Sequence, residues 1–150
     1  MTQEEKQILS TDLCARLMHR VKCFVPVENC IMELTGKRLN YFCFHKEEWG
    51  YDYSHELEVV LDPLNDSRNR YIVKPYLRPM SSMTEDECIT LSKLIPYETD
   101  AWKYIKTPIP LYIANIEQFD FFHSHHLDWR GLIHKGLAIE VTEENNPYKE

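Results

Sequence analysis

The chain has 150 residues and a mass of 17.9 kDa, with 43% hydrophobic and 27% charged residues. This length is typical of one domain, and this composition excludes a disordered, collagen-like or glycine-rich protein. The net charge of −7, from 24 acidic and 17 basic residues, disfavours binding to nucleic acid or to an anionic membrane surface. We therefore predict a single domain over residues 1–150 that binds neither.

The compartment is predicted from the apolar runs and the cysteines. No apolar run approaches the roughly 18 residues that span a bilayer, and the first six residues are polar and acidic, unlike a signal peptide. The five cysteines are odd in number and include no C-x-x-C pair, which argues against a disulfide framework and against a zinc ribbon. We expect reduced thiols that pack in the core of a cytoplasmic protein.

The first predicted elements are a helix and a strand. Thr2 and Glu5 match a capping box at a helix start. Apolar residues then recur every four positions and mark one buried stripe, at Leu9, Leu13 and Leu17. At Arg20 the period changes to two, which predicts a half-buried strand whose inward residues are Val21, Cys23, Val25 and Val27.

Further strands are predicted in the middle of the chain. Ile31–Leu34 and Leu39–Phe44 flank Thr35–Arg38, which predicts a hairpin turn with Gly36 at positive φ. Weaker strand candidates are Leu57–Leu61 and Tyr71–Lys74. Two prolines, Pro75 and Pro79, then predict an extended connection.

Helices are predicted to dominate the last part of the chain. Thr84 and Glu87 form a second capping box before a helix that ends ahead of Pro96. A third helix is expected to start at Asn115, with Ile116, Phe119, Phe122 and His123 facing inward. A short helix capped by Asp128 and stopped at Gly136 follows, then a strand over Leu137–Val141 and a frayed acidic tail over 142–150.

This order of elements predicts the fold class. A helix followed by several strands and then mostly helices is typical of an α+β protein, not of alternating βαβ units. We expect an N-terminal helix, a small antiparallel sheet of about four to five strands, and C-terminal helices.

The densest group of ionisable residues is His123–Asp128, which contains three histidines within four positions. Imidazole and carboxylate groups bind zinc and similar ions. On a helix, however, only His123 and His126 share a face, and histidines also lie near the terminal carbonyls of helices. We favour the interpretation that these histidines lie at a helix end, near its terminal carbonyls. Metal binding or metal-dependent catalysis through His123–His126 is the alternative.

A second group combines charged and aromatic residues over positions 45–56. Its carboxylates beside His45 and His55 would serve acid–base catalysis only if one of them were buried. We interpret this segment as a solvated loop whose aromatic residues can form a binding patch, because Trp and Tyr supply much contact area at low entropic cost. The candidate interaction residues are Trp49, Tyr51 and Tyr53.

Motifs that would mark an enzyme are lacking. There is no dinucleotide or phosphate loop, no nucleophile elbow and no zinc-protease motif. The cysteines lie in apolar helix and strand patterns, so none is indicated as a nucleophile. We therefore expect a protein that is not an enzyme, with no catalytic residue, no metal ligand and no cofactor.

Two blocks of sequence resemble a known family. They are Lys74–Thr84 (KPYLRPMSSMT) and His125–Glu140 (HHLDWRGLIHKGLAIE), together with Glu4–Lys6 and Asp12–Leu17 near the start. These blocks resemble a family of small uncharacterised proteins encoded in prophages and mobile elements of gut anaerobic bacteria. The resemblance is weak over residues 25–70, and family members usually read Pro-Tyr-Gly where this chain has Met18-His19-Arg20. It implies an intracellular, phage-type accessory protein and no particular reaction.

Within the second block, Asp128, Trp129 and Arg130 are candidates for a structural clamp. An N-cap at Asp128 would place Arg130 in the first helical turn, where the helix dipole disfavours a cation. Arg130 is therefore expected to have a carboxylate or carbonyl partner. Together these features predict a non-enzymatic accessory protein that binds another macromolecule, namely a phage or host protein.

Overall fold

A computed structural model describes residues 2–26, 28–38, 41–46, 57–60, 73–94 and 116–149 of the chain. The predicted aromatic patch of Trp49, Tyr51 and Tyr53 lies outside these residues. So does the expected cap at Asn115. The predicted helix end before Pro96 is confirmed, because the helix over Glu85–Lys93 has its C-cap at Leu94.

The N-terminal helix α1 spans Gln3–Ala15 and begins with the predicted capping box. The Glu5 amide donates to Thr2 Oγ1 at 3.1 Å, and the Thr2 amide donates to Glu5 Oε2 at 2.6 Å. These bonds satisfy amides that have no partner within the helix, so the helix start is fixed locally. A short 3₁₀ turn, η1 (Leu17–His19), follows and ends at Arg20, which has a left-handed φ of 53°.

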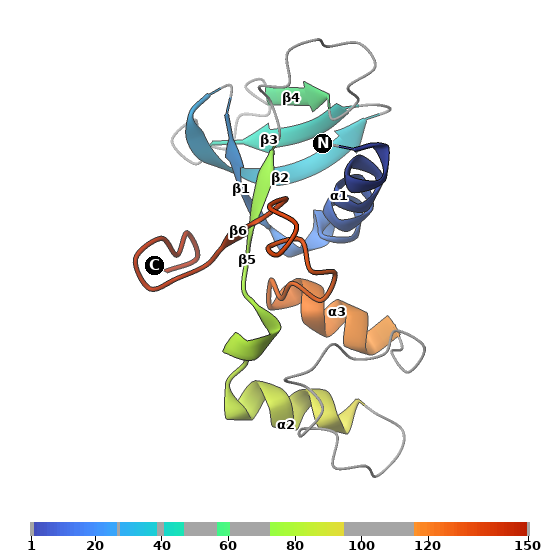
Figure 1. Ribbon diagram of the computed structural model, residues 1–150, viewed down its shortest axis with the longest axis vertical. Helices are drawn as coiled ribbons and strands as arrows, with labels where there is room; N and C mark the ends of the chain where they lie inside the picture. Colours follow the sequence, from blue (N-terminus) through green and yellow to red (C-terminus); the bar gives the residue numbers. More distant parts are fainter. Residues whose placement is uncertain are drawn as a thin grey trace.

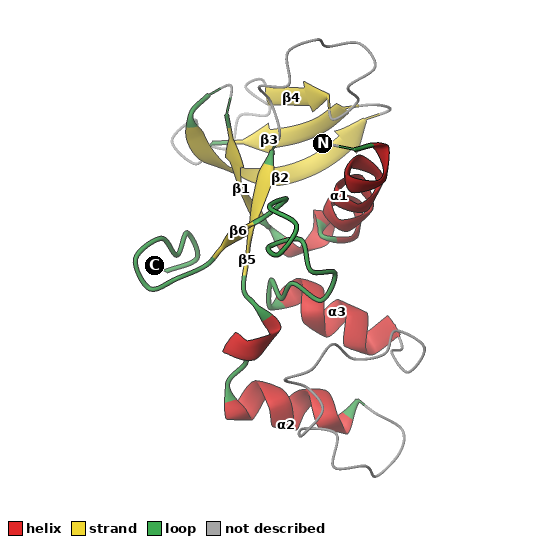
Figure 2. Ribbon diagram, in the orientation of Figure 1, coloured by secondary structure: helices red, strands yellow, loops and turns green. Residues whose placement is uncertain are grey.

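The described strands form one sheet in the order β4-β3-β2-β1-β5-β6. Neighbouring strands are antiparallel except β5 and β6, which are parallel. The predicted α+β class, with an N-terminal helix, a mostly antiparallel sheet and C-terminal helices, is confirmed (Figures 1 and 2). The strands are β1 (Lys22–Val25), β2 (Cys30–Arg38), β3 (Tyr41–His45), β4 (Leu57–Val60), β5 (Lys74–Leu77) and β6 (Ile139–Glu140).

The predicted hairpin turn at Thr35–Arg38 is wrong, because β2 continues through it. The register shifts between Leu34, which faces Phe44, and Gly36, which faces Cys43. Thr35 is therefore the extra residue of a β-bulge. The bulge absorbs this residue, and β2 stays paired with β3 on both sides of it. The Thr35 hydroxyl donates to the Cys43 carbonyl at 3.2 Å, and Gly36 has no positive φ.

The fifth strand covers Lys74–Leu77 and so extends beyond the predicted Tyr71–Lys74 at its C-terminal end, while Tyr71 and Ile72 lie outside the described residues. It contains Pro75, which lies opposite Cys23 of β1. The pairing with β6 involves only Tyr76 and Leu77. Pro75 therefore lies beyond the end of β6, and a residue without an N–H is tolerated at such a sheet edge.

The buried apolar side chains of the described residues form two clusters. The first joins α1 to the sheet, as Figure 1 shows, and includes Leu9, Leu13, Val21, Cys23, Val25, Met32, Leu34, Phe42, Phe44, Val73, Leu77, Leu132, Leu137 and Ala138. The second lies between α2 (Glu85–Lys93) and α3 (Ile116–Ser124) and consists of Leu91, Phe121, Phe122 and Leu127. The capping box predicted at Thr84 and Glu87 is confirmed.

Two expectations for the C-terminal part are wrong. Ile116 does not face inward but is 78% exposed, while Phe121 is buried in its place. The predicted helix from Asp128 to Lys135 is instead a series of turns. Gly131 has a φ of 72°, a conformation that interrupts a right-handed helix after its first turn.

The C-terminal residues 142–149, for which the sequence predicts a frayed tail, return to the sheet through Tyr148. The Tyr148 hydroxyl donates to the Tyr76 carbonyl at 2.8 Å and accepts from the Lys22 amide at 3.1 Å. Its ring stacks on His126 with centroids 4.0 Å apart. No helix within the described ranges is long and apolar enough to cross a membrane.

Candidate functional site

The site begins with two charged residues on the buried face of α1. Asp12 and Arg16 lie on the same stripe as Leu9 and Leu13, and both charged side chains are fully buried. Arg16 donates from Nε to Asp12 Oδ2 at 2.6 Å and from Nη2 to Asp12 Oδ1 at 3.2 Å. Since a buried charge is costly unless it is paired and hydrogen-bonded, this bidentate geometry allows both ions to remain buried.

The same ion pair holds the segment that follows α3. Arg16 Nη2 also donates to the Leu127 carbonyl at 2.8 Å. Arg130 Nε lies 3.3 Å from Asp12 Oδ1, as an ion pair that lacks the alignment of a hydrogen bond. Asp12 therefore balances two guanidinium groups, one from its own helix and one from a loop more than a hundred residues away.

Asp128 organises that loop from within. Its two carboxylate oxygens accept the amides of Leu132 and Ile133, each at 2.8 Å. Burial raises the pKa of Asp128, while the two amide bonds act in the opposite direction. The Asp128 carboxylate therefore does not cap the helix that the sequence predicts. It holds together the turn that contains Gly131 by binding two backbone amides.

The loop is also tied to β5 by backbone bonds. The Arg78 amide donates to the His126 carbonyl, and the Asp128 amide donates to the Arg78 carbonyl, both at 2.8 Å. The Arg78 side chain forms a bidentate pair with Glu87 of α2, at 2.7 and 2.8 Å. This pairing lowers the pKa of Glu87 to about 2. One strand end therefore joins α2 to the loop.

The Trp129 side chain packs from the loop against α3. Its indole Nε1 donates to His123 Nε2 at 3.0 Å, and its ring lies 4.7 Å from that of Phe119. The Arg130 guanidinium lies over the Trp129 ring, 4.0 Å from the ring centroid. Such cation–π contact favours a fixed orientation for both residues.

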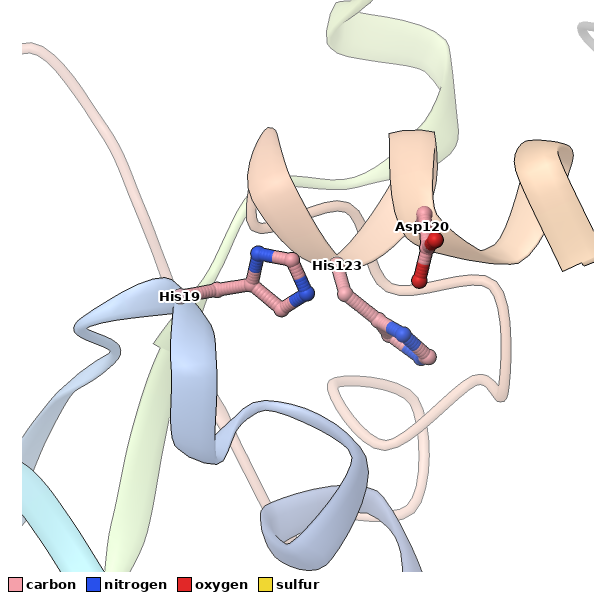
Figure 3. Close-up of side chains that lie close together, drawn as sticks. All are labelled: His19, Asp120 and His123. Atoms are coloured by element: carbon pink, nitrogen blue, oxygen red, sulfur yellow. The ribbon is translucent and has the colours of Figure 1, made fainter.

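A histidine–carboxylate group lies beside Trp129, where η1 approaches α3. The ligand atoms of His19, Asp120 and His123 all lie within 4.8 Å of one another. Figure 3 shows the His123 imidazole between the other two side chains, with His19 reaching it from the turn after α1. His123 is buried, His19 is partly buried and Asp120 is exposed. Burial first, and then the charge of Arg16, lowers the pKa of His123 to about 4, so its imidazole is neutral at neutral pH.

The other histidines of the predicted cluster are directed elsewhere. His125 stacks on Phe121, and its Nδ1 lies 2.9 Å from the Phe121 carbonyl. His126 stacks on Tyr148. In the described ranges, the one candidate ligand group of at least three residues is therefore His19, Asp120 and His123, and not the consecutive run His123–His126.

Two exposed apolar residues lie close to this group along the chain. Among the described residues, Met18 is 88% exposed and Ile116 is 78% exposed, the two largest values for big apolar side chains. Met18 precedes His19 in η1, and Ile116 is one helical turn before Asp120 on the same stripe of α3. We call Met18, His19, Ile116 and Asp120 the η1–α3 surface.

The structure joins two of the residues singled out in the sequence, His123 and Trp129, and uses the neighbouring Asp128 and Arg130 in the same loop. Asp12, Arg16, His19 and Asp120 were not predicted from the sequence. A signal for the first two was present, because Leu9, Asp12, Leu13 and Arg16 follow helical spacing and place an opposite charge pair within an apolar stripe. His19 carried no such signal, since its partners lie a hundred residues further along the chain.

Comparison of the chain with protein-family models, with curated proteins and with solved structures finds no match.

Proposed function

We propose that this chain is a non-enzymatic accessory protein of phage type that acts by binding another protein through its η1–α3 surface. The observation that carries the proposal is the pair Met18 and Ile116, which are 88% and 78% exposed on two elements that meet at His19 and His123. The phage-type context rests on the resemblance of the Lys74–Thr84 and His125–Glu140 blocks.

The composition of the surface supports a protein partner. Methionine is enriched in the cores of protein interfaces, and so are tryptophan and arginine, two residue types that lie beside this surface. The stacked Trp129 and Arg130 are partly exposed beside the same helix. Their orientation is set by Asp12 and His123 before any partner binds, and such preorganisation reduces the entropy lost on association.

The buried charges support a binding role over a catalytic one. The carboxylates of Asp12 and Asp128 are engaged by Arg16, Arg130 and two backbone amides. Both carboxylates therefore stabilise the loop. A general acid or base would instead have to reach a proton of a substrate.

The test is affinity capture from the host cells with a double variant, Met18→Asp and Ile116→Asp. Both side chains are exposed, so the substitutions should leave the fold intact while placing charges at the centre of the surface. Ile89→Asp is the matched control, because Ile89 is 45% exposed on α2. We expect mass spectrometry to identify a partner with the wild type and the control but not with the double variant. Equal recovery in all three would place the partner elsewhere on the molecule.

The alternative of a metal site within His123–His126 receives no support, because His125 stacks on Phe121 and His126 stacks on Tyr148.

A further inference from the structure

The group formed by His19, Asp120 and His123 has the donor chemistry of a transition-metal site. Two imidazoles and a carboxylate suit Zn²⁺ and its neighbours in the first transition row, whereas Mg²⁺ and Ca²⁺ prefer oxygen ligands. Three protein ligands leave a fourth position open to water or to a group from a partner. The residues come from η1 and α3, so neither element alone supplies the site.

The distances require a modest adjustment on binding. Metal–ligand bonds of about 2.0–2.2 Å in a tetrahedral site place ligand atoms about 3.3–3.5 Å apart, and the present atoms are up to 4.8 Å apart. Asp120 is exposed and His19 is partly buried, so both side chains can rotate towards His123 with little loss of packing. His123 is fixed by its burial and by Trp129.

The hydrogen bond from Trp129 places a condition on metal binding. An indole N–H is a donor only, so His123 Nε2 must present its lone pair, and the neutral ring then carries its proton on Nδ1. A metal at Nε2 would replace the indole directly. A metal at Nδ1 would shift the proton to Nε2, where it would face the Trp129 N–H at 3.0 Å. In either case the bond between Trp129 and His123 is lost.

We propose that His19, Asp120 and His123 bind a divalent first-row transition ion such as Zn²⁺, and that metal binding and the Trp129–His123 hydrogen bond exclude each other. The nearby Arg16 and Arg130 disfavour a cation, and Asp12 and the Asp120 ligand oppose their charge. The site is independent of the proposed protein-binding role, although two of its ligands, His19 and Asp120, belong to the η1–α3 surface.

The first experiment is calorimetric titration of the whole protein with Zn²⁺, comparing His19→Ala and Asp120→Asn with two matched controls. His134→Ala removes an exposed histidine outside the group, and Glu117→Gln removes an exposed carboxylate on the same helix. We expect each ligand variant to lose about tenfold or more in affinity, because even indirect disturbance of metal ligands costs about 10–100-fold. Both controls should bind as the wild type does.

Thermal melts should show that the ligand variants remain folded, since the altered side chains are not buried. Cysteine thiolates also bind Zn²⁺, so the decisive readout is the difference between ligand variants and controls. An absence of Zn²⁺ binding, or equal affinities for the ligand variants and controls, would overturn the site.

The second experiment uses Trp129→Phe, which keeps an aromatic ring beside Phe119 and Arg130 but has no N–H. If metal and indole compete for His123, this variant should bind Zn²⁺ about two- to tenfold more tightly than the wild type, which corresponds to one net hydrogen bond. If Trp129 only packs beside the site, the Trp129→Phe variant should show no gain in Zn²⁺ affinity. Unchanged or weaker Zn²⁺ binding would overturn the mutual exclusion.

Discussion

Asp12 of α1 and Arg16, the C-cap residue one turn later, form an ion pair of 2.6 Å in which neither side chain is exposed to solvent. Arg130 approaches the same Asp12 carboxylate at 3.3 Å, from the loop that follows α3. One buried carboxylate therefore links the first helix of the chain to its C-terminal part. The shape of the surface beside Trp129 depends on this link.

Asp12→Asn should destabilise the protein by about 3–5 kcal/mol, because it leaves the buried Arg16 without a counterion. Arg130→Met should cost only about 1 kcal/mol or less, because the Arg130 side chain is 25% exposed and water screens its charge. Chemical denaturation of both variants gives the two free energies of unfolding. Equal losses, or a neutral Asp12→Asn, would contradict the role assigned to Asp12.

Local signals in the sequence predicted the elements that depend on local physics. The capping boxes at Thr2 and Thr84 satisfy amides three residues away, and the period-two pattern around Cys23 reflects one strand facing a core. The bulge at Thr35 could not be predicted in this way. Its conformation depends on the register with β3, and Gly36 gave the signal of a turn instead.

Asp128→Ala should destabilise the protein by about 1–3 kcal/mol, since it leaves the amides of Leu132 and Ile133 without their acceptors. Asp128→Asn retains one carbonyl oxygen and should lose less. Urea midpoints for the two variants, with Zn²⁺ titration alongside, measure stability and binding separately. An unchanged midpoint with altered metal affinity would mean that Asp128 serves a binding site rather than the loop.

Local sequence signals also indicated part of the candidate site, but not the contacts that join distant parts of the chain. Asp128 and Arg130 are close in sequence, and the unfavourable place of a cation near a helix start indicated a partner for Arg130. The identity of that partner, Asp12, depends on how α1 packs against the loop. His19 likewise joins His123 only through tertiary packing, which no spacing along the chain records.

Acid should destabilise the protein between pH 6.5 and about 4, partly through His126. Burial, with a contribution from Arg16, lowers the pKa of His126 from 6.5 to about 4. The unfolded chain therefore binds a proton over this range that the folded protein does not, and the free energy of unfolding falls as the pH falls.

His126→Phe removes this titration and keeps a ring that can stack on Tyr148. Phenylalanine is also less tolerant than histidine of the left-handed φ of 54° at this position. This lowers the free energy of unfolding equally at all pH values and does not change its slope against pH. Stability measured against pH should fall less steeply in this variant, while His134→Gln should follow the wild type. A slope unchanged by His126→Phe would show that His126 is not protonated on unfolding.

Tyr148→Phe should cost about 1–3 kcal/mol, because the Lys22 amide and the Tyr76 carbonyl both lose a partner while the ring stacking on His126 remains. Limited proteolysis should also cut residues 142–149 faster in the variant. If the C-terminal residues were frayed, as their sequence alone suggests, neither stability nor cleavage rate would change.

Site-specific photo-crosslinking in host cells tests the proposed binding role most directly. A photoreactive phenylalanine analogue is placed in turn at Met18, at Ile116 and, as a control, at Ile89, all three of which are exposed. We expect one and the same partner to be trapped from positions 18 and 116 and not from position 89. A partner trapped from position 89 alone, or no partner trapped from positions 18 and 116, would contradict the proposed binding role.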